Sequence, residues 1–218
     1  MNNIFGLLIS FVYIALVIGI SAIFTKLSKE ASRKFIHIML SNWWIIAMVF
    51  FNNVWFAALG PAVFVVINFL SYKYNIIKVM ERDDSAASEK TLGTVFYAIS
   101  LLVLVILTFG INKQPILGLI GALVMGYGDG FAAIAGQSIK SKEYHVFGSK
   151  KTVAGSIVMF LISGIIIAST LFYLNVDLWM LKTIIIAILV TLLEAISPKG
   201  SDNLTVPIAA TLLAWMMV

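Results

Sequence analysis

Long uninterrupted apolar runs limit what this chain can fold into more than any other feature. Of its 218 residues, 61% are hydrophobic and only 11% are charged, whereas a soluble domain of this size has about a quarter of its residues charged. Such runs predict transmembrane helices, because a helix satisfies its own backbone hydrogen bonds in lipid. The alternating pattern of a transmembrane barrel is missing. We therefore expect an all-α integral membrane protein.

The apolar runs divide into about eight candidate spans, within a range of about seven to nine, since a crossing helix needs roughly 20 apolar residues. The region 36–71 allows two arrangements, either two short helices joined at Asn52–Asn53 or one crossing and a re-entrant piece. The candidate spans are 4–24, 36–52, 54–71, 93–110, 115–136, 153–174, 178–196 and 203–218.

Basic residues gather in alternate connections of this eight-span arrangement. The positive-inside rule places those connections in the cytoplasm and both termini outside. The polar segments are too short to fold a catalytic domain of their own, so we expect one polytopic domain, 1–218, with its active site at the cytoplasmic face. All lysines and arginines except Lys113 and Lys182 fall in four segments, 25–35, 72–92, 137–152 and 197–202.

Composition and missing motifs exclude several functions. The chain has no cysteine, which removes disulfides and thiolate chemistry. The net charge of +5 reflects membrane topology rather than nucleic-acid binding. Motifs of zinc proteases, acyl hydrolases and dinucleotide-binding folds are also missing.

Asp129 lies in the stretch MGYGDGFAAIAG, 125–136, near the end of the fifth span. An ionisable residue at membrane depth is costly and usually faces a cavity or a partner, so we interpret Asp129 as functional. The neighbouring Gly126, Gly128 and Gly130 allow the backbone to bend or a ligand to approach the main chain. Small residues four apart also pack helices together. That alternative explains the glycines but not the aspartate.

Two later segments carry polar groups toward the same face. In 137–156, Lys150 and Lys151 precede Thr152, Gly155 and Ser156. Ammonium groups beside a helix N-terminus suit a polyphosphate, and contact with anionic lipid is an equally good alternative.

In 194–207, Glu194 ends a span, and Asp202 and Asn203 open the next. Singly, Asp202 is best explained as a helix cap, and Glu194 as the partner of a lysine. Together with Asp129 they place three carboxylates beside lysines at one face. This combination describes a Mg²⁺–nucleotide site.

Arg33 and His37 are one helical turn apart and therefore share a helix face. His37 is either a buried hydrogen-bonding residue or a group that binds phosphate or moves a proton. Lys90 precedes Gly93 at a helix start, where a solvated cap is the simpler alternative.

Five motifs occur in a fixed order and together resemble the polyprenol kinase family, which includes dolichol, phytol and farnesol kinases and CTP-dependent diacylglycerol kinases. The resemblance covers about residues 31–207. It implies transfer of the γ-phosphoryl group of a nucleoside triphosphate, usually CTP, to a lipid alcohol with the help of Mg²⁺. The motifs are RKFIH (33–37), EKTLGT (89–94), GDGFAAIAG (128–136), KKTVAGS (150–156) and SPKGSDNLTVP (197–207).

The resemblance and the chemistry of the side chains together suggest roles for individual residues. We expect Asp129, Asp202 and Glu194 to hold Mg²⁺, and Glu194 or His37 to position or deprotonate the lipid hydroxyl. The expected nucleotide- and phosphate-binding residues are Arg33, Lys90, Gly128, Gly130, Lys150, Lys151, Thr152, Gly155, Ser156 and Asn203. The compact chain suggests a prokaryotic plasma membrane.

Two alternatives stay open at this point. Phosphatidate cytidylyltransferases, which make CDP-lipids, have a similar pattern, but Ala154 stands where theirs often has glutamate. A small ion-coupled transporter would use Asp129 and Glu194 as a relay. The transporter predicts an internal repeat and mid-membrane carboxylates, whereas the sequence shows no convincing repeat and places the carboxylates at span ends.

Overall fold

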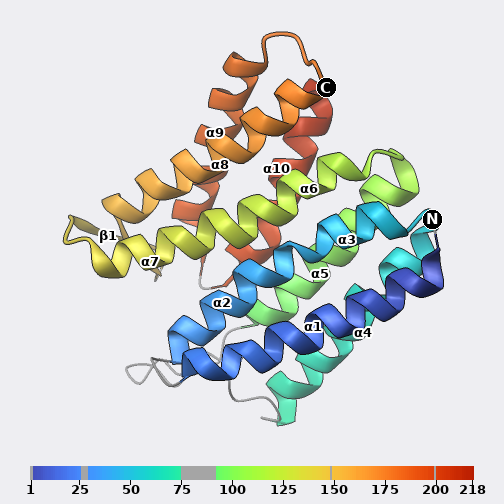
Figure 1. Ribbon diagram of the computed structural model, residues 1–218. Helices are drawn as coiled ribbons and strands as arrows, with labels where there is room; N and C mark the ends of the chain where they lie inside the picture. The colour runs from blue at the N-terminus through green and yellow to red at the C-terminus, as the bar shows by residue number, and fades with distance from the viewer. Residues whose placement is uncertain (1, 26–28, 75–91, 148, 199) are drawn as a thin grey trace.

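Each apolar run forms helix in the computed structural model, which describes residues 2–25, 29–74, 92–147, 149–198 and 200–218 (Figure 1). The all-α class is confirmed, and one short antiparallel hairpin is added to it. In order, the elements are α1 (Asn3–Thr25), α2 (Lys29–Ser41), α3 (Trp43–Phe50), α4 (Val54–Tyr74), α5 (Gly93–Val105), the π-helix η2 (Ile106–Ile111), α6 (Pro115–Leu123), the π-helix η3 (Val124–Asp129), α7 (Gly130–Ser138), β1 (Glu143–Val146), β2 (Ser149–Thr152), α8 (Val153–Tyr173), α9 (Trp179–Ile196) and α10 (Asp202–Met217).

Six helices in the described part of the chain are long and apolar enough to cross a membrane. The other two expected spans are present as helices but fall short of that length. The second begins at Lys29 rather than at residue 36 and is interrupted at Asn42, between α2 and α3, while α10 has 16 residues. The six are Asn3–Phe24, Val54–Tyr74, Gly93–Ile111, Pro115–Ser138, Val153–Tyr173 and Trp179–Ile196.

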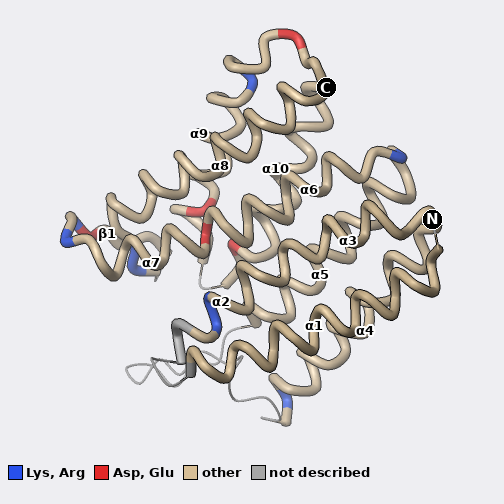
Figure 2. The backbone as a smooth tube through the Cα atoms, in the orientation of Figure 1, with Lys and Arg blue, Asp and Glu red and all other residues tan. Residues whose placement is uncertain are grey.

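The helices alternate in direction, so the connections gather at two opposite ends (Figure 1). The hairpin and the starts of α2, α5 and α10 lie at one end, and both chain termini lie at the other. Most of the blue lysines and arginines lie at the first end (Figure 2). This arrangement agrees with the alternation expected from the sequence. The cytoplasmic assignment of that end stays a prediction.

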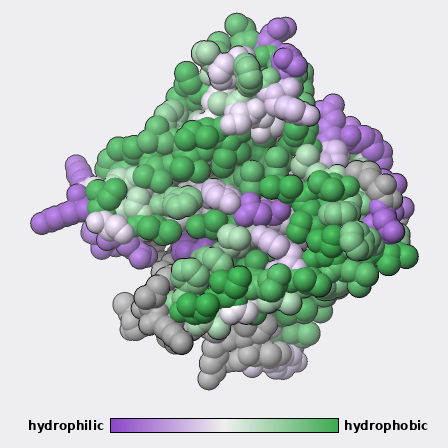
Figure 3. Space-filling view, in the orientation of Figure 1, coloured by the Kyte–Doolittle hydropathy of each residue, from purple (hydrophilic) through white to green (hydrophobic). Residues whose placement is uncertain are grey.

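The outer surface is largely apolar, as lipid contact requires. Green apolar residues cover most of the visible face in Figure 3. Large side chains such as Ile4, Leu161 and Ile165 are more than half exposed. In water this exposure would favour aggregation, whereas in a bilayer it is the expected lipid-facing surface.

The continuous helix Pro115–Ser138, made of α6, η3 and α7, occupies the centre of the bundle. Of its most apolar 18-residue stretch, 67% is buried inside the bundle, compared with 22–44% of the corresponding stretch in each of the other five spans. Neighbouring helices approach it closely at its glycines. A Cβ atom at Gly126 would overlap Ser41 of α2, one at Gly130 would lie 2.5 Å from Ile38, and one at Gly128 would lie 2.9 Å from Met159 of α8.

The missing side chains at these positions thus make room for helices. The geometry favours helix packing as the explanation of the glycines around Asp129. The contact of Gly128 and Gly130 with a nucleotide stays a prediction. It also explains how a polar residue reaches the bundle centre. The close approach of α2 and α8 surrounds Asp129 with helices that can supply partners.

The packing predicts that Gly121→Ala destabilises the protein, because the added methyl group would meet the backbone carbonyl of Pro207 in α10. Overpacking of this kind costs about 1–3 kcal/mol. Gly164→Ala is the matched control, since nothing lies within 4 Å of a Cβ there. Thermal unfolding in detergent should show a lower midpoint for Gly121→Ala alone. Equal midpoints would contradict the packing.

Candidate active site

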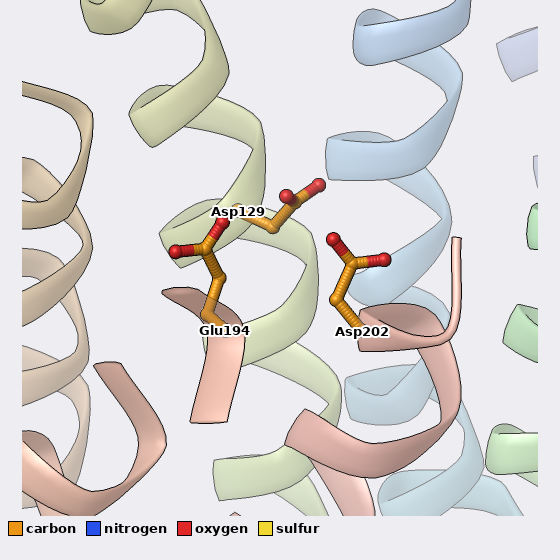
Figure 4. Close-up of side chains that lie close together, drawn as sticks. All are labelled: Asp129, Glu194 and Asp202. Atoms are coloured by element: carbon orange, nitrogen blue, oxygen red, sulfur yellow. The ribbon is translucent and has the colours of Figure 1, made fainter. Parts of the chain in front are cut away.

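Three carboxylates from distant parts of the chain meet at the basic end of the bundle. Asp129 ends η3, Glu194 lies in the last turn of α9, and Asp202 begins α10. One ligand oxygen from each lies within 4.8 Å of the others. Figure 4 shows the three side chains converging from separate elements. The metal-ligating triad expected from the sequence is therefore present as a geometric cluster.

The local sequence explains how Glu194 and Asp202 come together. Pro198 cannot continue the ladder of α9, and Gly200 adopts a left-handed φ of 78° that suits glycine. The chain therefore reverses between the two acids. Ser201, rather than Asp202, precedes the first helical residue of α10. Asp202 is therefore not the N-cap residue: its Oδ1 accepts from the Asn203 amide at 3.0 Å, and its Oδ2 faces the cluster.

Two lysines neutralise part of this buried charge. The Lys151 ammonium contacts the carboxylates of Glu194 and Asp202, the latter at 3.2 Å. The Lys34 ammonium lies 2.9 Å from Asp129 Oδ2, and both of these side chains are about nine-tenths buried. Buried charges need such partners, because leaving water costs several kcal/mol for each ion. Three carboxylates and two ammonium groups leave one negative charge uncompensated within this set of five.

Lys151 stays protonated in this setting. Burial by itself lowers the pKa of its ammonium, but the adjacent Glu194 and Asp202 carboxylates outweigh that effect. They hold the pKa of Lys151 above its ordinary value. The site therefore presents a permanent positive charge beside the carboxylates, as charge neutralisation of a phosphate requires.

His37 projects from α2 toward Asp129. Its Nε2 lies 3.7 Å from Asp129 Oδ2, which is too long for a hydrogen bond. Its ring lies against that of Tyr97, with centroids 4.4 Å apart. Nε2 is buried and has no hydrogen-bond partner among the described residues. An orphaned buried nitrogen beside a carboxylate cluster is a candidate for substrate contact.

The expected lysine pair is separated by the hairpin. Lys150 and Lys151 are adjacent in β2, and neighbouring side chains in a strand point to opposite faces. Lys150 pairs with Glu143 at 2.8 Å, with both side chains at least half exposed. The structure thus separates the two ammonium groups, because the segment forms a strand rather than a loop, and their shared contact with one polyphosphate stays a prediction. Only Lys151 reaches the carboxylates.

The start of α8 has little capacity left for phosphate. The amide of Val153 donates to the Lys142 carbonyl at 3.0 Å. The next two amides, of Ala154 and Gly155, donate to the hydroxyls of Ser141 and Thr152 at 3.1 Å. Helix N-termini bind anions through amides that lack partners, and these three have them. The predicted phosphate-binding turn instead attaches the hairpin to α8.

The remaining predicted residues have mixed outcomes. The hydroxyls of Ser156 and Tyr144 share a hydrogen bond of 2.6 Å, which again joins the hairpin to α8. Arg33 and Asn203 line a groove next to His37. Lys90 falls outside the described residues.

Sequence reasoning missed Lys34 as a site residue and counted it only as a topological charge. A signal was available, since Lys34 is three residues before His37 and shares its helix face. Its burial was not visible, because that depends on which helix lies opposite. The structure places η3 there.

Comparison with curated proteins finds phytol kinases. The chain is 33% identical over 215 residues to the phytol kinase of Synechocystis sp.. The aligned region covers 93% of this chain and 87% of that protein. It is 28% identical to probable phytol kinase 1 of Oryza sativa subsp. japonica and 30% identical to probable phytol kinase 2 of Glycine max, both chloroplastic. It spans 65% and 66% of those two proteins. Searches of family profiles and solved structures find no match.

The ion pairing predicts a characteristic double-mutant result. Lys34→Met leaves the Asp129 carboxylate without its nearest cation, and removing one partner of a buried pair costs about 3–5 kcal/mol. The double variant Lys34→Met/Asp129→Asn should recover much of that loss. Thermal unfolding of the two single variants, the double variant and the wild type measures the coupling. Additive losses would show that the pair contributes nothing specific.

Proposed function

The chain belongs to the polyprenol kinase family, and from this premise we propose that it is a membrane-embedded lipid-alcohol kinase acting on phytol or a related isoprenoid alcohol. It transfers the γ-phosphoryl group of a nucleoside triphosphate, with CTP as the expected donor. The observation that carries the proposal is the convergence of three carboxylates and two buried lysines at one end of an apolar helical bundle. The family relationship supplies the class of reaction.

The carboxylate cluster suits Mg²⁺. Mg²⁺ prefers hard oxygen ligands, commonly one or two carboxylates together with substrate phosphates, and three separate helical elements supply such oxygens here. Asp129, Glu194 and Asp202 would hold the metal, whose contribution when bound is to neutralise charge on the triphosphate. The net negative charge of the five-residue cluster favours a cation.

The protein's own groups would do the remaining work by positioning and electrostatics, which is most of what phosphoryl transfer requires. Lys151 and Lys34 provide positive charge within the cluster. Burial of the carboxylates keeps water away, since the side chains of Glu194 and Asp202 are 5% and 14% exposed. His37 Nε2 is the group available to orient the acceptor hydroxyl.

The direct test uses purified protein in nanodiscs with Mg²⁺ and γ-labelled CTP or ATP. The lipid panel is phytol, farnesol, undecaprenol, dolichol and diacylglycerol, and label is followed into the lipid phase. We expect label in phytol or farnesol, with CTP as the better donor. Asp129→Asn should reduce transfer about 100-fold or more. Asp177→Asn is the control, because that exposed carboxylate lies between α8 and α9, away from the site.

Other products would overturn the proposal. Transfer of an α-label to phosphatidate with release of pyrophosphate would identify a cytidylyltransferase. No transfer in either assay would favour the transporter alternative. EDTA should abolish transfer in the wild type, and added Mg²⁺ should restore it.

The hairpin predicts that two adjacent lysines differ sharply. Lys151→Met should lower turnover about 100-fold or more, since it removes the cation in contact with two carboxylates. Lys150→Met should change turnover less than about twofold, because exposed pairs contribute little. The measurement is the initial rate at saturating alcohol, alongside a thermal midpoint for each variant. Equal losses would mean that both lysines face the nucleotide after all.

A further inference from the structure

A groove opens beside His37, between α2, α4, α5 and the start of α10. It contains about 450 Å³ of empty space, including its open mouth. Its lining combines apolar and polar side chains. The apolar residues are Ile36, Leu40 and Tyr97, and the polar ones include Arg33, Asn68 and Asn203.

Two residues of this groove carry buried polar atoms that have no hydrogen-bond partner in the described part of the chain, namely His37 Nε2 and Asn68 Oδ1. Asn68 is only 7% exposed. Its Nδ2 donates to the Thr94 carbonyl at 3.0 Å, which fixes Oδ1 as the free end of the amide. An unsatisfied buried acceptor costs about 1–3 kcal/mol. Two such atoms in one groove indicate that a ligand supplies the missing donor.

Asn68 Oδ1 is an amide oxygen and can only accept. We assign the proton of the neutral His37 ring to Nδ1, so that the buried Nε2 carries the lone pair and also accepts. A phosphate group offers further acceptors and does not match these atoms. A hydroxyl group on a hydrocarbon chain supplies one donor, for one of these acceptors, and carbon for the apolar residues.

The groove lies next to the carboxylate cluster. His37 Nε2 is 3.7 Å from Asp129 Oδ2, and Asn203 directly follows Asp202. Lys151 lies on β2 of the hairpin, which packs against α8. Neither of these elements contributes a lining residue to the groove. Phosphoryl transfer needs the attacking and leaving oxygens roughly in line on opposite sides of phosphorus. If the donor phosphates lie beside Lys151, the groove is the place from which the oxygen of the acceptor alcohol can attack.

We propose that this groove is the acceptor subsite, which takes the hydroxyl-bearing end of an isoprenoid alcohol. The hydroxyl donates its hydrogen bond to His37 Nε2, and the first carbons of the chain contact Ile36, Leu40 and Tyr97. During transfer the alcohol oxygen forms a bond to the γ-phosphorus while the bond from that phosphorus to the β–γ bridging oxygen breaks. His37 Nε2 orients the hydroxyl, the alcohol proton passes to the transferred phosphate or to water, and the nucleoside diphosphate leaves. This inference rests on the proposed kinase function.

Photolabelling of the wild-type protein tests the groove without relying on turnover. The probe is a phytol analogue with a diazirine near the hydroxyl, and the labelled peptides are mapped by mass spectrometry. We expect label on α2 or the start of α5, and excess unlabelled phytol should suppress it. Label confined to other helices would overturn the subsite, even if the kinase assay succeeded. A failed kinase assay with label in the groove would overturn the proposed function but not the alcohol site.

A matched pair of tryptophan substitutions provides the kinetic test. Leu40→Trp fills the groove, whereas Leu70→Trp places the same side chain on α4 where the native leucine is 39% exposed and does not line the groove. Leu40→Trp should raise the KM for the alcohol about tenfold or more and leave the KM for the nucleotide unchanged. It should also lose the photolabel. Leu70→Trp should change none of these.

The opposite kinetic pattern would assign the groove to the nucleobase. In that case Leu40→Trp would raise the KM for the nucleotide and leave the KM for the alcohol unchanged, and the acceptor subsite would be refuted. If Leu40→Trp fails to fold, Leu40→Ala removes the same wall contact without added bulk. The wild-type labelling map remains decisive in either case.

Discussion

The arrangement of this protein depends on burying three carboxylates inside an apolar bundle. Charges moved from water into such surroundings are tolerated only with close partners, and here the partners come from α2 and β2. Each partner ties a distant part of the chain to the centre. Lys34 joins α2 to η3, and Lys151 joins the hairpin to the ends of α9 and α10. The electrostatics of the site thus also fixes the positions of the elements that form it.

The central helix makes this burial possible through its small residues. Glycines let α2, α8 and α10 approach the backbone of α6–η3–α7, so the aspartate in η3 lies within reach of side chains on several helices. The π-helical geometry of η3 ends at Asp129, and π-turns often occur at functional sites. The same glycines that first suggested ligand approach are better explained by packing, while the aspartate they surround keeps its functional interpretation.

The sequence predicted the parts of the site that follow from span boundaries. Asp129, Glu194 and Asp202 each lie near the end of an apolar run, so a correct alternation of spans was sufficient to bring them to one face. It did not predict the separation of Lys150 from Lys151, because the polar segment that carries them has no strong strand pattern. The pairing of β1 with β2 decides which lysine faces inward. Lys34 was missed for a related reason, since burial of a helix face depends on its neighbours.

The pairing of Lys151 bears on how such a site can accept both a metal and a nucleotide. Its ammonium contacts the carboxylates of Glu194 and Asp202, which are two of the three carboxylates that we propose as metal ligands. Without a ligand, the lysine keeps two nearby carboxylates from repelling each other, so the bundle can fold with the site assembled. A lysine side chain is flexible and carries its charge at the tip. In the proposed reaction Asp129, Glu194 and Asp202 would hold a divalent cation that offsets their remaining negative charge, and the mobile Lys151 ammonium would supply positive charge to the phosphates.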